Sequence, residues 1–130
     1  MPDVPIDWCP NFDKPSEAWY PGDEYVDIIG LDVYLNKRWI ANDWNEVLSL
    51  PSGLRWLERF AQAHKKLISF PEWATNYDDG KFVENMHAWM RKRPVVYQAY
   101  WNDDNAFPGR FERYPSVQRA YLKAWGNKPA

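Results

Sequence analysis

The chain has 130 residues, a formal net charge of −2 at neutral pH and a sequence pI near 5.7. This length suits one domain with its own core, and the acidic balance argues against the clustered positive surface that nucleic-acid binding requires. Aromatic residues make up 18% of the chain, and nine of them are Trp. So many rings cannot all be buried with their polar atoms satisfied. We expect some to line an open cleft, where they suit an uncharged, stackable ligand such as a sugar.

A single cysteine, Cys9, excludes an internal disulfide and a multi-cysteine metal site. We expect neither a metal nor a cofactor. No run of about 18 apolar residues is present for a membrane span, and the first residues lack the basic start and apolar stretch of a signal peptide. The localisation stays open, because a longer natural protein would be secreted if a signal preceded Met1.

The first half of the chain contains two segments that predict strands. Residues 4–11 read as a short strand closed by Cys-Pro-Asn, and an irregular polar loop follows over residues 12–22. Residues 26–34 are almost continuously β-branched or apolar, which predicts a strand buried on both faces of a parallel sheet. Alternation gives this strand a wholly apolar face and a second face of small and polar residues. The apolar face holds Ile29, Leu31 and Val33, and the second holds Ile28, Gly30, Asp32 and Tyr34.

The second half contains two more predicted strands, each ending in polar and aromatic residues. Residues 67–72 form an apolar run that ends in Glu72, and alternation places Glu72 on the same face as Ile68 and Phe70. On this segment alone, a glutamate that simply faces water remains the alternative. Residues 95–101 predict the fourth strand, which ends in Trp101 and is followed by Asn102.

Helices are predicted between and after the later strands. A long loop with Trp39 and Trp44 precedes a helix that begins after the N-cap candidate Ser52 and ends near His64. A second helix covers residues 81–91, and a third opens at Pro115 and ends before Gly126. This βα order predicts an α/β fold with a parallel sheet. Functional groups of such sheets gather at the carboxyl ends of the strands.

Four stretches carry a resemblance to a known family. They are Trp-Cys-Pro-Asn at residues 8–11, the run from Tyr-Pro-Gly-Asp to Gly-Leu-Asp-Val-Tyr at residues 20–34, Pro-Glu-Trp at residues 71–73, and Tyr-Gln-Ala-Tyr-Trp-Asn at residues 97–102. Together they resemble the last four strands of glycoside hydrolase family 26, the β-mannanase family. The resemblance implies that residues 1–130 are one unit, the C-terminal half of a (β/α)8 TIM barrel with strands 5–8.

The resemblance also implies roles for individual residues. Glu72 matches the catalytic nucleophile after the seventh strand, Tyr34 matches a tyrosine close to it, and Trp101 matches a tryptophan on which a sugar ring stacks. Trp8 and Asn11 would line the site from the fifth strand. We add two neighbours as candidate substrate-binding residues, Trp73 and Asp32. One departure is Ala74, because the family usually has glycine at this position.

The chemistry implied by the family needs a second carboxyl group. Retaining glycoside hydrolysis uses a nucleophile and an acid/base about 5 to 5.5 Å apart, and in the family the acid/base glutamate follows a histidine after the fourth strand. No His-Glu pair occurs in this chain. Four βα units also leave two open sheet edges. We therefore expect a missing N-terminal half-barrel, or a second copy of the chain, to close the sheet.

Two functions follow from these features. The first is a retaining endo-β-glycosidase, present here as the half with the nucleophile, that acts on a plant-type polysaccharide such as mannan, glucan or xylan. The second is a non-catalytic carbohydrate-binding fragment, and we expect the isolated chain to be inactive. A single-stranded nucleic-acid module built on stacking aromatics is disfavoured by the acidic pI.

Overall fold

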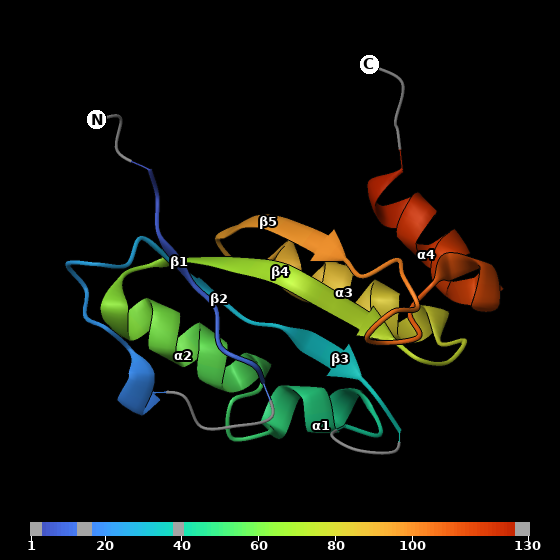
Figure 1. Cartoon of the computed structure of the whole chain (residues 1–130), viewed down its shortest axis with the longest axis horizontal. Helices are drawn as coiled ribbons and strands as arrows, with labels where there is room; N and C mark the ends of the chain where they lie inside the picture. The colour runs from blue at the N-terminus through green and yellow to red at the C-terminus, as the bar shows by residue number, and fades with distance from the viewer. Residues whose placement is uncertain (1–3, 13–16, 38–40, 127–130) are drawn as a thin grey trace.

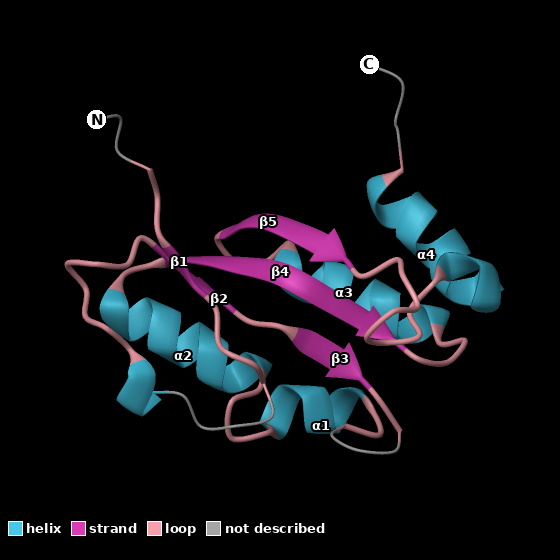
Figure 2. Cartoon of the chain, viewed as in Figure 1, coloured by secondary structure: helices cyan, strands magenta, loops and turns pink. Residues whose placement is uncertain are grey.

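A computed structural model of the chain describes residues 4–12, 17–37 and 41–126. Its strands form one sheet in which every neighbouring pair is parallel (Figure 1, Figure 2). The strands are β1 (Asp7–Trp8), β2 (Ile28–Gly30), β3 (Val33–Leu35), β4 (Leu67–Thr75) and β5 (Val95–Tyr100). The α-helices are α1 (Trp44–Ser49), α2 (Leu54–His64), α3 (Gly80–Met90) and α4 (Pro115–Trp125), and single 3-10 turns are η1 (Glu17–Trp19) and η2 (Phe111–Arg113).

The central strand of the sheet is β4. On one side it pairs first with β2 and then with β3, and on the other side it pairs with β5, while β1 pairs with β2. The strand predicted over residues 26–34 is thus present as β2 and β3, separated by a short interruption at Leu31 and Asp32. The order of strands and helices confirms the predicted α/β fold with a parallel sheet.

Helices cover one face of this sheet, which we call the outer face. The apolar face predicted for residues 26–34 lies there, since Ile29, Leu31 and Val33 are fully buried. The ring of Phe70 in β4 packs against Trp89 of α3 at a centroid distance of 5.7 Å. Burial of these apolar side chains is the main stabilising contribution to such a layer.

The helix ends agree closely with the sequence patterns. The N-cap of helix α2 is Gly53, one residue after the predicted cap Ser52. The helix ends at His64, where Lys65 adopts a left-handed conformation (φ 54°). Helix α4 opens at Pro115 as predicted. Helix α1 was not predicted; it begins where the Asp43 carboxylate accepts a hydrogen bond from a backbone N–H. Parts of the loops predicted around residues 12–22 and at Trp39 lie outside the described residues.

Strand β4 contains one residue more than its neighbours in its middle. Gly30 pairs with Ser69 and Val33 pairs with Trp73, so three steps along β2 and β3 match four steps along β4. A register shift in the same part of β4 also appears against β5. An extra residue of this kind is a β-bulge, which bends a strand and changes the direction of the side chains that follow. Pro71 lies in the bulge, where a missing backbone N–H is tolerated.

The bulge corrects one prediction about Glu72. Phe70 and Trp73 both face the outer helices, and Glu72 lies between them on the opposite side, in contact with Tyr34. Glu72 therefore does not share a face with Ile68 and Phe70, because the extra residue interrupts the alternation. Strand β4 also continues past Glu72 to Thr75.

The sheet face opposite the helices, which we call the inner face, carries the polar residues of the strands. Within the described residues, β1 and β5 are the edge strands of the sheet. Val96 and Tyr97 of β5 are 45% and 44% exposed. No helix of the described chain is long and apolar enough to cross a membrane.

Candidate functional site

Glu72 and Tyr34 form the centre of the inner face. The Tyr34 hydroxyl donates a hydrogen bond of 2.5 Å to Glu72 Oε2. Burial of the phenol raises the pKa of Tyr34 well above its usual range, and the hydrogen bond and charge of Glu72 raise this pKa further. Tyr34 is therefore a neutral donor that holds one carboxylate oxygen of Glu72 in a fixed position.

Asp32 and Cys9 extend this centre toward β1. The Cys9 thiol donates a hydrogen bond to Asp32 Oδ1 at 3.2 Å. Burial raises the pKa of Asp32, and the charge of Glu72 raises it further, although the hydrogen bond from Cys9 acts in the opposite direction. Burial also raises the pKa of the Cys9 thiol, with Asp32 as the second cause, so Cys9 stays protonated. The thiol is thus a hydrogen-bond donor to Asp32, and its role is structural.

We expect Asp32→Asn to increase the free energy of unfolding at neutral pH relative to wild type. Because folding raises the pKa of Asp32, its contribution to stability is fully present below the unfolded pKa and is lost as the pH rises through the folded pKa. An amide at this position avoids that loss. Urea unfolding at a series of pH values measures the difference, which should disappear in acid. A difference in the free energy of unfolding that stays constant across the pH series would contradict a raised pKa of Asp32 in the folded state.

A second cluster lies deeper on the inner face, at the amino ends of the strands. Asp7 Oδ2 accepts hydrogen bonds from Ser69 Oγ at 2.5 Å and from the Tyr97 hydroxyl at 2.6 Å. A Cβ on Gly30 would lie 2.7 Å from Ser69 Oγ and 2.8 Å from Asp7 Oδ1, so this cluster requires glycine at position 30. The alternation in residues 26–34 predicted an inner position for Gly30, but nothing in the sequence indicated its partners.

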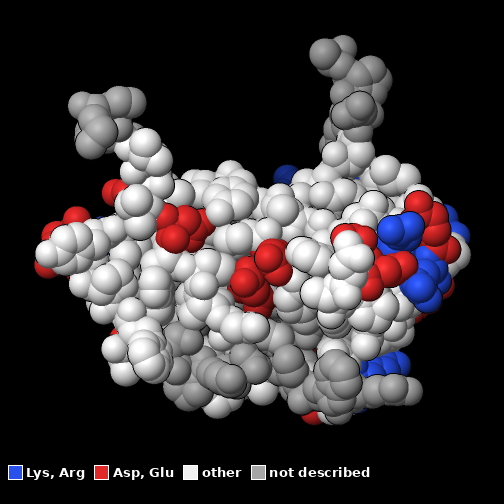
Figure 3. Space-filling view, in the orientation of Figure 1, with Lys and Arg blue, Asp and Glu red and all other residues white. Residues whose placement is uncertain are grey.

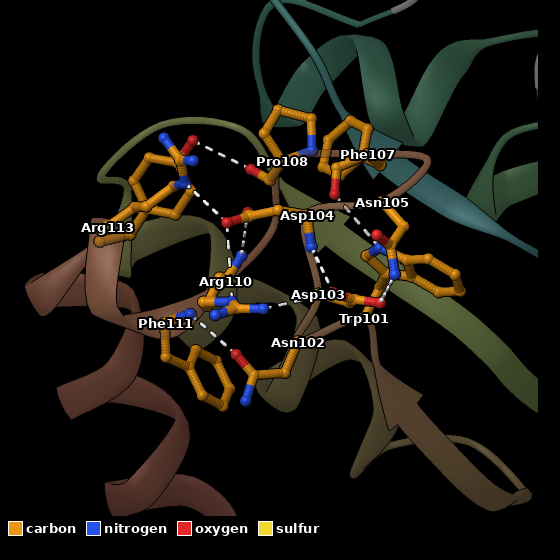
Figure 4. Close-up of polar contacts among 11 residues, drawn as sticks. Trp101, Asn102, Asp103, Asp104, Asn105, Phe107, Pro108, Arg110, Phe111 and Arg113 are labelled. Atoms are coloured by element: carbon orange, nitrogen blue, oxygen red, sulfur yellow. Dashed lines mark hydrogen bonds and ion pairs between the residues drawn. The ribbon is translucent and has the colours of Figure 1, made fainter.

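Trp101 lies at the carboxyl end of the sheet, after β5. Its backbone N–H donates to the Trp73 carbonyl at 2.9 Å, which continues the pairing of β5 with β4. The indole Nε1–H donates to the Phe107 carbonyl at 3.2 Å, and the Phe107 ring packs on Tyr34 with centroids 4.6 Å apart. The loop of residues 101–114 thereby joins Trp101 to the Tyr34–Glu72 pair. Figure 4 shows Trp101 and Phe107 within this loop.

The sequence matches the family model of glycosyl hydrolase family 26 over residues 6–107, which is most of the chain. The chain belongs to glycosyl hydrolase family 26. The matched range contains Glu72, Tyr34 and Trp101 together with β1 to β5. No curated protein sequence matches the chain.

Solved structures of family 26 mannanases share the fold of this family 26 chain. The β-mannanase BoMan26A from Bacteroides ovatus superposes with a TM-score of 0.61 at 21% identity, over 94% of this chain and 37% of that one. The catalytic domain of an endo-β-1,4-mannanase from Bacillus sp. JAMB-750 gives a TM-score of 0.55 at 24% identity, over 88% and 37%. The chain therefore spans little more than a third of the length of these structures.

Two residues predicted for the site of this family 26 chain lie elsewhere. Trp73 is fully buried on the outer face, where its ring contacts Phe82 and Trp125 at 5.9 and 5.5 Å. The ring of Trp8 packs against Phe60 of α2 at 5.9 Å, again on the outer face. Both residues follow inner-face positions by one step along a strand, so their rings point away from Glu72.

Asn11 keeps a position compatible with the predicted site. It forms a parallel bridge with Asp32 beyond the end of β1, and it is exposed. Acidic side chains lie over the middle of the face shown in Figure 3, and the visible basic side chains gather mainly beside α4. In the described part of the chain, no group of three or more His, Cys, Asp or Glu residues is placed to hold a metal ion.

Proposed function

We propose that this chain is the nucleophile-bearing half of a retaining endo-β-glycosidase of the β-mannanase type. The observation that carries the proposal is the Tyr34–Glu72 hydrogen bond on the inner face, beside Trp101. Tyr34 donates its hydrogen bond to Glu72 Oε2. The other carboxylate oxygen, Oε1, accepts no hydrogen bond from Tyr34 and attacks the anomeric carbon. The proteins with similar structures are mannanases, which supports mannan as the substrate.

The proposed reaction needs a proton donor that the described residues do not provide. The leaving oxygen of a polysaccharide must be protonated by a carboxyl group about 5 to 5.5 Å from Glu72. Asp32 lies close enough to Glu72 for the two charges to interact, but its carboxylate accepts a hydrogen bond from Cys9, and we assign it a structural role. We therefore assign the acid to a segment outside this sequence.

The segment that closes the sheet is either a missing N-terminal half-barrel or a second copy. The inner face favours the first option, because Asp7, Asp32 and Glu72 would be doubled if two copies met face to face. Like charges brought together in a poorly solvated interior oppose association. Asp7 Oδ1 is also buried without a hydrogen-bond partner, so a segment with a donor at this place would satisfy it.

An activated inhibitor tests the nucleophile without the missing acid. Dinitrophenyl 2-deoxy-2-fluoro-β-mannoside has a leaving group that departs as the phenolate and needs no proton. We expect a Glu72 oxygen to form a bond to the anomeric carbon as the bond between that carbon and the phenolic oxygen breaks, which leaves a stable glycosyl ester on the peptide that contains Glu72. Mass spectrometry of the digested protein locates the ester.

Matched variants make this experiment decisive. Glu72→Gln should remain unlabelled, whereas Glu112→Gln, which alters an exposed glutamate of η2, should be labelled like wild type. Labelling of another residue, or no labelling of the wild type, would overturn the nucleophile assignment. Saturable binding of mannan without any ester would instead support a non-catalytic carbohydrate-binding fragment, which the incomplete set of carboxyl groups also permits.

A further inference from the structure

We infer that Phe107 is a saccharide-contacting residue that, with Tyr34 and Trp101, forms an aromatic wall beside Glu72. The inference rests on the proposed function and adds a residue to its site. Phe107 is partly exposed and touches both other members: its ring packs on Tyr34 at 4.6 Å and an interplanar angle of 48°, and its carbonyl holds the Trp101 indole at 3.2 Å. No other ring of the described loop 101–114 contacts Tyr34.

The loop that carries Phe107 is held in place by its own polar contacts. Arg113 Nε donates to Asp104 Oδ2 at 3.0 Å, and Arg110 lies 3.5 Å from Asp103 Oδ1 (Figure 4). The backbone N–H of Asp104 donates to Asp103 Oδ1 at 2.7 Å. The carboxyl end of the loop, residues 108–114, lies beyond the range that matches the family model. The position of Phe107 is therefore fixed by features of this chain before any ligand binds, which reduces the entropic cost of binding.

Close packing around Gly109 positions the loop segment that follows Phe107. A Cβ on Gly109 would lie 2.5 Å from the Trp101 carbonyl oxygen and 3.2 Å from the Ala74 Cβ. Ala74 follows Glu72 on the inner face by two residues, so the loop rests directly on the strand that carries Glu72. Ala74, where the family usually has glycine, is thus in contact distance of the loop's turn.

The wall suits one class of ligand. Two flat rings and an indole near a carboxylate present apolar surfaces to the C–H faces of a pyranose ring, while hydroxyl groups of the sugar reach polar atoms at the edge. The inner face carries the carboxyl groups of Asp7, Asp32 and Glu72, which disfavour an anionic sugar. We assign the wall to a neutral pyranose of a β-linked polysaccharide, bound next to Glu72.

Binding of mannohexaose to the full chain, measured by isothermal titration calorimetry, tests this role. We expect Phe107→Ala to weaken binding about tenfold, as loss of one aromatic contact does. Phe111 is a matched control in the same loop, because its ring stacks on Tyr100 at 4.5 Å and faces α4. Phe111→Ala should leave the affinity within about twofold of wild type.

Two further variants separate sugar contact from loop packing. Phe107→Leu keeps an apolar side chain against Tyr34 but has no flat face, so it should bind as weakly as Phe107→Ala, whereas Phe107→Tyr should restore the affinity. Wild-type affinity in Phe107→Leu, equal losses in the Phe107 and Phe111 variants, or no binding by wild type would overturn the inference. If Glu72 is labelled by the fluoro-mannoside while Phe107→Leu binds normally, only this inference fails. If Phe107-dependent binding is found without labelling, only the proposed nucleophile fails.

Discussion

Replacement of Trp73 by alanine is expected to lower the free energy of unfolding by about 3 to 5 kcal/mol, as in other Trp→Ala substitutions in protein cores. The Trp73 ring is fully buried at the meeting point of β4, α3 and α4, and its indole N–H donates to Gln98 Oε1 at 2.7 Å. The substitution leaves a large cavity and also leaves the Gln98 oxygen without this donor. Urea denaturation followed by circular dichroism measures the change.

Trp19→Ala is the matched control for this prediction. Trp19 lies in η1 and is 79% exposed, so its loss should change the free energy of unfolding by no more than about 0.5 kcal/mol. Equal losses in the two variants would show that Trp73 does not pack as described. The comparison also bears on function, because a buried Trp73 affects sugar binding only through stability.

The second large effect concerns the leaving group of the substrate. The proposed mechanism gives this chain a nucleophile without the acid/base group. We therefore expect the isolated chain to be inactive on mannan but to release a burst of dinitrophenolate from dinitrophenyl β-mannoside, because hydrolysis of the glycosyl ester also needs the missing group. A general acid contributes about 10²- to 10⁴-fold to rate, and a dinitrophenolate leaving group needs none of it. Release of dinitrophenolate, followed by absorbance, measures the first activity, and reducing-sugar release from mannan measures the second.

Glu72→Gln and Asp32→Asn are the variants that test this account. Glu72→Gln should abolish dinitrophenolate release, and Asp32→Asn should retain most of it, because we assign Asp32 a structural role. Hydrolysis of mannan by the isolated chain at a comparable rate would mean that a described carboxyl group acts as the acid. If Asp32→Asn then abolished mannan hydrolysis, Asp32 would be identified as that acid.

Much of the fold could be predicted because local patterns and tertiary packing agree. The apolar alternation around Leu31 predicted both a strand and its apolar face, and the residues of that face are buried in the structure. Helix α4 begins at Pro115, where the fixed φ and missing N–H of proline cost nothing. Helix α1 was missed because it is only six residues long and its apolar pattern is too short to distinguish it from a loop.

The site was harder to predict because side-chain direction depends on register. The bulge at Pro71 adds one residue to β4, and without it the alternation that begins at Ile68 places Glu72 on the wrong face. No local pattern reports such an extra residue, since it becomes visible only against the paired strands. The resemblance to family 26 singled out Glu72, our proposed nucleophile, by its neighbours in the sequence, and this prediction did not depend on the alternation.

Aromatic residues were the least predictable members of the site. Three aromatic residues lie near strand ends or in loops: Trp8, Trp73 and Phe107. The rings of Trp8 and Trp73 pack against helices, whereas the ring of Phe107 packs on Tyr34. An aromatic side chain suits a core and a sugar platform equally well. Its sequence position alone does not decide between them, whereas the pleat of the neighbouring strand does.

The central place of β4 in the sheet has a consequence for how the chain folds. All strand pairs are parallel, so none forms as a simple hairpin, and each pairing must first close a loop across an intervening segment. Strands β2 and β3 pair with residues 67–75, which a ribosome makes later. During synthesis, the apolar segment of residues 26–35 is therefore present before β4, the strand with which it pairs. Folding dominated by such distant contacts is slow, and an apolar segment left exposed during folding is prone to aggregate or to bind a chaperone.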